Sequence, residues 1–115
     1  MNAPEPEQDD DDDVEAVLRQ TRADFVGGFQ AACAAMAQLI DDLHHNADGS
    51  ARGELERVLH RMGGLAGTIG LPTVSLRARE LEDLVRDRPS ERLDSSHARR
   101  LLDAIRLGFE QDTAT

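Results

Sequence analysis

The chain contains no lysine, tryptophan or tyrosine, and it has only three phenylalanines. With aromatic content at 3%, the core must be built mostly from Leu, Val, Ile, Met and Ala, which favours helices over strands. The single cysteine, Cys33, excludes an internal disulfide and fits a reducing, cytoplasmic compartment. No long apolar run is present, so no membrane span is expected. The acidic N-terminus also lacks the features of an export signal.

The charge of the chain is unevenly distributed. A length of 115 residues predicts one domain, with a formal net charge of -10. The first 15 residues carry eight acidic and no basic side chains, whereas the rest carries 15 acidic side chains and all 13 arginines. This nearly neutral remainder has no basic footprint, so neither nucleic acid nor an anionic membrane is an expected partner. Residues 1–12 lack an apolar anchor and are predicted to form a disordered acidic tail.

The remaining sequence, residues 13–111, has the apolar spacing of helices. Apolar side chains recur every three or four positions, and no segment alternates with period two. We expect a short helix from Asp13, a longer one ending near residues 44–50, a third over 51–68, a fourth starting at Pro72, and a last one capped by Ser95 or Ser96. Short connections between such helices predict an all-α fold, an antiparallel up-down four-helix bundle with an additional short N-terminal helix. No apolar stripe is left over, so a monomer is expected.

Three glycines accompany a histidine in the third predicted helix, in the stretch LHRMGGLAGTIG at residues 59–70. On a helical wheel His60 lies opposite the apolar face and therefore points to solvent. Gly63, Gly64 and Gly67 follow it at i+3, i+4 and i+7, and each costs roughly 1 kcal/mol of helix stability relative to alanine. We interpret the glycines as keeping the surface beside His60 bare, so that another macromolecule can approach closely.

The chemistry of an isolated exposed imidazole narrows the possible roles of His60. No serine or cysteine nucleophile accompanies it, so a hydrolytic triad has no support. Glu56, at i−4, is a possible acidic partner but also reads as a surface charge. A neutral imidazole is a competent nucleophile near neutral pH. The electrophile that best suits such a group in a docked partner is a phosphoryl group.

The other histidines and the cysteine have structural interpretations. His44 and His45 follow Asp41 near a helix C-terminus, and histidines and carboxylates can bind zinc. Adjacent residues on a helix do not face one another, however, and a helix C-terminus favours histidine through its dipole. His97 is expected on the surface of the last helix, and Cys33 is expected in the core.

The stretch HRMGGLAGTIG resembles the signature of histidine phosphotransfer (HPt) domains. That signature is a histidine followed by an apolar residue at +2, usually lysine at +3, glycine at +4, a small residue at +6, an apolar residue at +9 and glycine at +10. Those positions are occupied here by His60, Met62, Gly63, Gly64, Ala66, Ile69 and Gly70. The Leu81-Glu82 pair also matches a Leu-Glu pair that this family tends to carry downstream, and the resemblance covers residues 14–110.

The resemblance implies a phosphocarrier rather than a turnover enzyme. The exposed histidine, His60, accepts a phosphoryl group from an aspartyl-phosphate on a receiver domain and passes it to another receiver. Expected partners are receiver domains of response regulators or hybrid histidine kinases, in a bacterial, cytoplasmic phosphorelay. Such a carrier has no cofactor or metal of its own, because Mg²⁺ belongs to the receiver.

One position departs from the HPt signature, because Gly63 replaces the lysine that is expected to steady the phosphoryl oxygens. Four arginines are candidate substitutes or partner contacts: Arg57, Arg61, Arg79 and Arg86. Arg57 and Arg86 have the better direction, and Arg86 is preferred because a neighbouring antiparallel helix can aim it at the same face.

Two alternative functions remain open at this point. In the first, the domain is not phosphorylated and instead docks and sequesters a response regulator. In the second, it is a metal-binding bundle that uses His44, His45 and Asp41.

Overall fold

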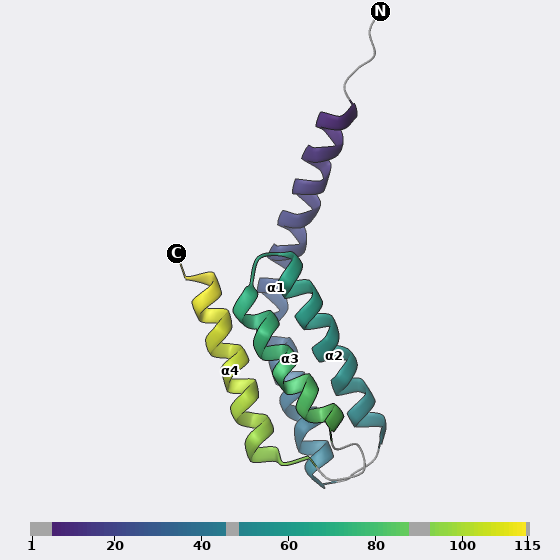
Figure 1. Ribbon diagram of the computed structural model, residues 1–115, viewed down its shortest axis with the longest axis vertical. Coiled ribbons are helices and arrows are strands. Elements are labelled where there is room, and N and C mark those ends of the chain that lie inside the picture. Colours follow the sequence, from purple (N-terminus) through teal and green to yellow (C-terminus); the bar gives the residue numbers. More distant parts are fainter. Residues whose placement is uncertain (1–5, 46–48, 88–92, 115) are drawn as a thin grey trace, which may run out of the picture.

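The computed structural model describes residues 6–45, 49–87 and 93–114, and it contains four helices and no strand within those ranges (Figure 1). The helices alternate in direction and lie side by side, which confirms the predicted all-α, up-down bundle. Their bounds are α1 Pro6–His45, α2 Gly49–Thr68, α3 Pro72–Asp87 and α4 Ser95–Thr113.

The N-terminal part of the fold differs from the prediction. A separate short helix was expected from Asp13, after a disordered tail, but α1 is one continuous helix that begins at Pro6. No proline or glycine lies between Pro6 and Gly27, and extending an existing helix costs less than nucleating a second one. Residues 1–5 of the expected tail lie outside the described part of the chain.

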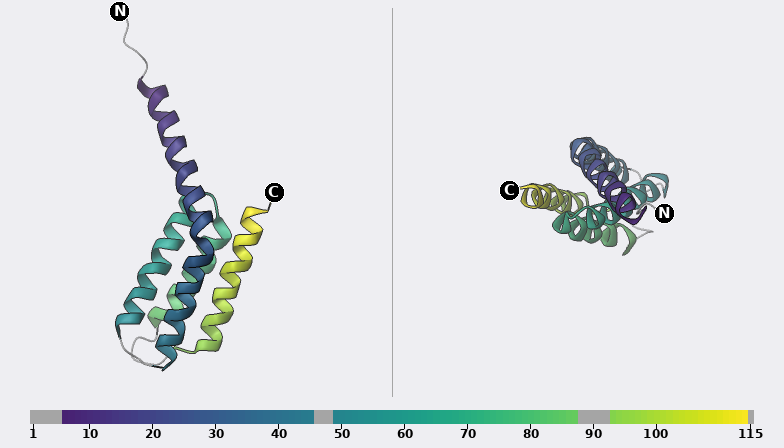
Figure 2. Two further views of the ribbon diagram at one scale, coloured as in Figure 1. Left: turned by 180° about the vertical axis from the view of Figure 1, so that it is seen from behind. Right: turned by 90° about the horizontal axis from the view of Figure 1, so that it is seen from above.

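The first turns of α1 extend beyond the bundle (Figures 1 and 2). Residues 12–20 are all exposed, including the apolar side chains of Val14, Val17 and Leu18. The premise of the expected monomer, that no apolar stripe is left over, therefore does not hold for this segment. The oligomeric state stays a prediction.

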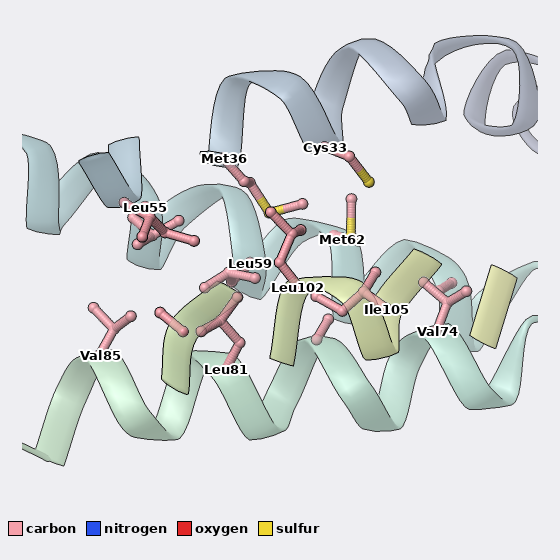
Figure 3. Close-up of a cluster of buried hydrophobic side chains, with 14 of the residues drawn as sticks. Cys33, Met36, Leu55, Leu59, Met62, Val74, Leu81, Val85, Leu102 and Ile105 are labelled. Atoms are coloured by element: carbon pink, nitrogen blue, oxygen red, sulfur yellow. The ribbon is translucent and has the colours of Figure 1, made fainter. Parts of the chain in front are cut away.

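The core consists of aliphatic and methionine side chains from all four helices (Figure 3). This composition follows from the scarcity of aromatic residues. The largest fully buried side chains are Phe29, Met36, Ile40, Leu43, Leu55, Leu59, Leu71, Leu81, Leu102, Ile105, Val74 and Val85. The few aromatic rings cluster between α1 and α4, where Phe29 stacks on Phe109 with ring centroids 3.8 Å apart.

The α2–α3 turn sets the antiparallel pairing that positions the site. Gly70 has φ +82°, a left-handed conformation that glycine adopts without strain. The Leu71 amide donates to the Ala66 carbonyl at 2.8 Å, which is the long bond of a Schellman motif, and Leu71 itself is buried. Pro72 then begins α3, as predicted. Arg22 of α1 donates to the Ile69 carbonyl at 2.9 Å and so fastens the turn to the bundle.

The cap of α4 corrects a second prediction. Asp94, rather than Ser95 or Ser96, is the N-cap, and its Oδ1 accepts a hydrogen bond from the His97 amide at 3.2 Å. Aspartate is as good an N-cap as serine, so the sequence alone did not discriminate between them.

Helix α1 is long and apolar enough, over Asp12–His45, to cross a membrane by length and composition alone. The core helix of a soluble protein passes the same test. Cys33, Met36 and Ile40 on α1 are fully buried against the rest of the bundle, so the C-terminal half of α1 is a core helix in this fold.

The contact between α3 and α4 supplies a test of the packing. A methyl group at Gly108 of α4 would lie 2.9 Å from Cγ2 of Thr73, so we expect Gly108→Ala to lower the free energy of unfolding by about 1–3 kcal/mol. Urea denaturation measures the change. Combining Gly108→Ala with Thr73→Ser, which removes the opposing methyl, should recover part of the loss. Equal stability of Gly108→Ala and the wild type would contradict the close contact.

Candidate functional site

His60 lies on the side of α2 that faces away from the core. The apolar side chains that α2 buries in the bundle are Leu55, Leu59, Met62 and Ala66. The His60 side chain is 76% exposed, which agrees with the helical wheel. Helix α2 therefore presents the imidazole to solvent on a rigid support.

A carboxylate from the neighbouring helix contacts the exposed ring. Nδ1 of His60 lies 3.1 Å from Oε2 of Glu82 on α3, and the Glu82 side chain is only 6% exposed. Glu56, the acid considered from sequence, pairs instead with Arg86. The acidic partner of His60 thus comes from a different helix.

The pairing with Glu82 selects one tautomer of the imidazole. An ionised carboxylate can only accept hydrogen bonds, so the ring proton is on Nδ1 and the Nδ1–H group donates a hydrogen bond to Glu82. Nε2 then carries the unshared electron pair. None of the hydrogen bonds in the described part of the chain engages Nε2 of His60. The arrangement leaves the nucleophilic nitrogen on the exposed side of the ring.

Arg86 shares the same carboxylate oxygen. Its Nη2 lies 2.9 Å from Oε2 of Glu82, and its Nε lies 3.4 Å from Oε1 of Glu56. A buried carboxylate is costly unless it is paired, and Arg86 provides the permanent charge that His60 does not. Arg86 reaches the His60 face from α3, as the sequence predicted, but its charge is directed to two carboxylates.

An open depression of about 830 Å³ surrounds His60 on the α2 surface, and it brings together three of the arginines chosen from sequence. Arg57, Arg61 and Arg86 line it with the histidine. The fourth, Arg79, lies outside this depression, where its Cγ approaches Gly63. Glu54 and Glu56 line the depression as well, and Arg86 pairs with Glu56. Among the described ion pairs none engages Arg57 or Arg61, so these two arginines are the cations left for an anionic group.

The three glycines have two different surroundings. Gly64 is exposed, and a methyl group placed there would have nothing within 4 Å, so it leaves bare backbone beside His60 as expected. Gly63 is buried, and a methyl there would lie 3.6 Å from the Ser75 carbonyl oxygen of α3. A methyl at Gly67 would lie 3.3 Å from Ser75 Oγ.

The expectation that all three glycines keep the surface beside His60 bare is wrong for Gly63, which is buried against α3. The wheel placed Gly63 outside the apolar stripe of α2 but could not show that α3 covers it. The Ser75 hydroxyl donates to the Gly63 carbonyl at 2.8 Å, which requires the two helices to pack closely. Gly67 is exposed, but a side chain there would meet Ser75, whereas Gly64 has open space around it.

A second, more apolar groove of about 450 Å³ lies between α1 and α2. Phe25, Phe29, Val58 and Met62 contribute to its lining, and Arg61 borders both this groove and the depression around His60. The groove is not evident from the sequence, because it depends on how the two helices pack.

The remaining candidates do not assemble into a site. Cys33 is fully buried, and this burial raises the pKa of its thiol, with Arg106 acting weakly in the opposite direction. Asp41 pairs with Arg99, and no group of three metal-ligating side chains occurs among the described residues. His44 and His45 are exposed with their rings 5.1 Å apart, and His97 is exposed on α4.

Comparison with known protein families gives a match to the sequence model of the Hpt domain over residues 29–111. The chain belongs to the Hpt domain family. The matched residues run from the core half of α1 through α4 and contain both His60 and Glu82. No significant match was found among curated proteins or among solved structures. Membership implies a role in histidine phosphotransfer within a phosphorelay, as a phosphocarrier.

The partner of His60 in this Hpt domain is the functional residue that sequence reasoning missed. Glu82 was noticed only as part of the Leu81-Glu82 pair. The signal that could have found it is the spacing of Ser75, Glu82 and Arg86, which places these polar side chains on one face of α3. That face had to be aligned with α2 before the contact could be identified.

The bare surface at Gly64 supplies a stability test for the Hpt domain. Gly64→Ala adds a methyl in open space within a helix, so we expect the free energy of unfolding to rise by about 1 kcal/mol. Gly67→Ala is the matched control, with a smaller gain because its methyl meets Ser75. Thermal or urea unfolding of both variants measures the difference. A destabilised Gly64→Ala variant would contradict an open site.

Proposed function

We propose that Nε2 of His60 is the nucleophile that accepts a phosphoryl group from a receiver-domain aspartate and donates it to another. The observation that carries this proposal is the exposed ring whose Nδ1 is held by buried Glu82. The partners are receiver domains of response regulators or hybrid kinases, in a bacterial cytoplasmic phosphorelay, and the Mg²⁺ belongs to the receiver.

The proposed step is a displacement at phosphorus. The electron pair on Nε2 forms the N–P bond while the P–O bond to the aspartyl carboxylate breaks, and the aspartate leaves as a carboxylate. The Nδ1 proton stays on the ring, so the phosphorylated imidazole gains positive charge. Glu82 offsets that charge at 3.1 Å. Reversal of the same step returns the phosphoryl group to a second receiver.

The surface around His60 supports docking of a receiver. Bare backbone at Gly64 allows close approach, which phosphoryl transfer requires because it depends mainly on positioning. The apolar groove between α1 and α2 offers area for burial next to the histidine, and Arg61 lies between the two. Arg57 adds positive charge to the depression around the ring.

The second candidate is a docking module that binds a response regulator without becoming phosphorylated. The observation that favours it is Gly63 in place of the lysine in the signature. Both candidates use the same surface, so only phosphorylation separates them.

Transfer of label from a phosphorylated receiver domain tests the proposal. We expect wild-type protein to acquire acid-labile, base-stable label, and we expect His60→Gln to acquire none. His97→Gln is the matched control, because His97 is equally a surface histidine but lies on α4, and it should be labelled normally. Receiver binding without any label on wild type would favour the docking module. Label that persists in His60→Gln would sink the proposal.

Glu82→Gln tests the role of the buried carboxylate. Glutamine keeps the size and an oxygen acceptor but removes the charge that offsets the phosphorylated ring, so we expect transfer to slow by about tenfold. Glu80→Gln on the same helix is the matched control, since Glu80 pairs only with Arg77. Nitrogen NMR of the His60 ring should show the Nδ1–H tautomer in wild type and less of it in Glu82→Gln. Unchanged transfer and tautomer would show that Glu82 has no such role.

A further inference from the structure

The missing lysine at Gly63 leaves open which cation binds the phosphoryl oxygens once they are on His60. We infer that Arg79 of α3 does so, reaching the phosphoryl group across Gly63. This inference rests on the proposed function, because it concerns the same histidine. It replaces the preference for Arg86 that the sequence suggested.

The alignment of α2 and α3 places Arg79 beside Gly63, three residues along α2 from His60. Ser75, Arg79, Glu82 and Arg86 are separated by four, three and four residues, so they share one face of α3. Their contacts with α2 run antiparallel: Ser75 bonds to Gly63, Glu82 contacts His60, and Arg86 contacts Glu56.

Arg79 falls between these contacts. Its Cγ lies 3.5 Å from the position that a Gly63 Cβ would occupy, so the aliphatic stem of Arg79 lies over that glycine. Four bonds separate Cγ from the terminal nitrogens of the guanidinium. That reach is comparable to the rise of ~4.5 Å along α2 between Gly63 and the level of His60.

The other arginines are less suitable for this role. Arg86 is held by Glu82 and Glu56, so its charge is already offset. Nη1 of Arg57 lies 3.8 Å from the position that a Cβ at Gly53 would occupy. Gly53 lies one turn before Arg57, whereas His60 follows Arg57 along α2. Arg61 lines both the depression around His60 and the groove toward α1, so its side chain is shared between two surfaces. Arg79 is exposed, and none of the ion pairs in the described ranges includes it.

The chemistry of the guanidinium fits the task. Two parallel N–H groups of arginine can donate to two phosphoryl oxygens, and such charge-assisted pairs are stronger than neutral hydrogen bonds. No atom or electron pair moves to or from Arg79; it stabilises charge while the N–P bond forms and the donor bond breaks. Gly63 and Arg79 are thus linked, because a long side chain at residue 63 would occupy the space of the arginine stem.

Phosphorylation by phosphoramidate tests the inference without a receiver. In this reaction Nε2 attacks phosphorus, the P–N bond of the donor breaks, and ammonia leaves. We expect Arg79→Ala to lower the rate of His60 phosphorylation by about tenfold. Arg77→Ala is the matched control, because it removes the same charge from the same helix but at a residue paired with Glu80, and it should react like wild type.

A double variant distinguishes charge from packing. Arg79→Ala combined with Gly63→Lys returns a cation through the position that the signature uses, and we expect it to regain most of the lost rate. An Arg79→Ala variant within twofold of wild type would overturn the role of Arg79. So would a double variant that keeps the Nδ1–H tautomer of His60, and with it the contact to Glu82, but stays as slow as Arg79→Ala. Wild type that remains unlabelled, or label that persists in His60→Gln, would instead refute the proposed function and the inference with it.

Discussion

The close packing of α3 against α2 determines where every functional side chain lies. Gly63 and Gly67 allow this approach, and the hydrogen bond from Ser75 to the Gly63 carbonyl fixes it. Because the helices run antiparallel, each turn of α3 then faces one turn of α2. A larger side chain at Gly63 would have to displace α3 or its side chains, and the alignment of Glu82 with His60 depends on that register.

Glu82 is the second constraint, because it is a nearly buried carboxylate shared by a histidine and an arginine. A buried charge is tolerated only when donors surround it, and here Arg86 provides a permanent positive partner. His60 is therefore not needed to neutralise Glu82 and remains free to react. The histidine gains a fixed orientation from this contact while most of its surface stays in solvent.

Much of the fold followed from local sequence features, whereas the site depended on tertiary packing. The apolar periodicity predicted the bundle, and Pro72 marked the start of α3 because proline is favoured in the first helical turn. The exposure of His60 followed from the helical wheel, because the apolar periodicity fixes which side of α2 faces the core. Contacts between helices were not accessible: neither Glu82 nor the burial of Gly63 can be derived from the spacing of α2 alone. The continuity of α1 was missed because a run of aspartates was read as a solvated tail.

Because α1 extends past the bundle, the local stability of the helical backbone differs between the two parts of this one helix. Residues 12–20 make backbone hydrogen bonds without burying their side chains, whereas Phe29, Cys33 and Met36 are fixed in the core. Short helical segments without tertiary support are marginal in water, so local opening begins at the free end and stops where burial starts. The thermodynamic boundary of the domain therefore lies in the middle of α1, near the point where the family match also begins.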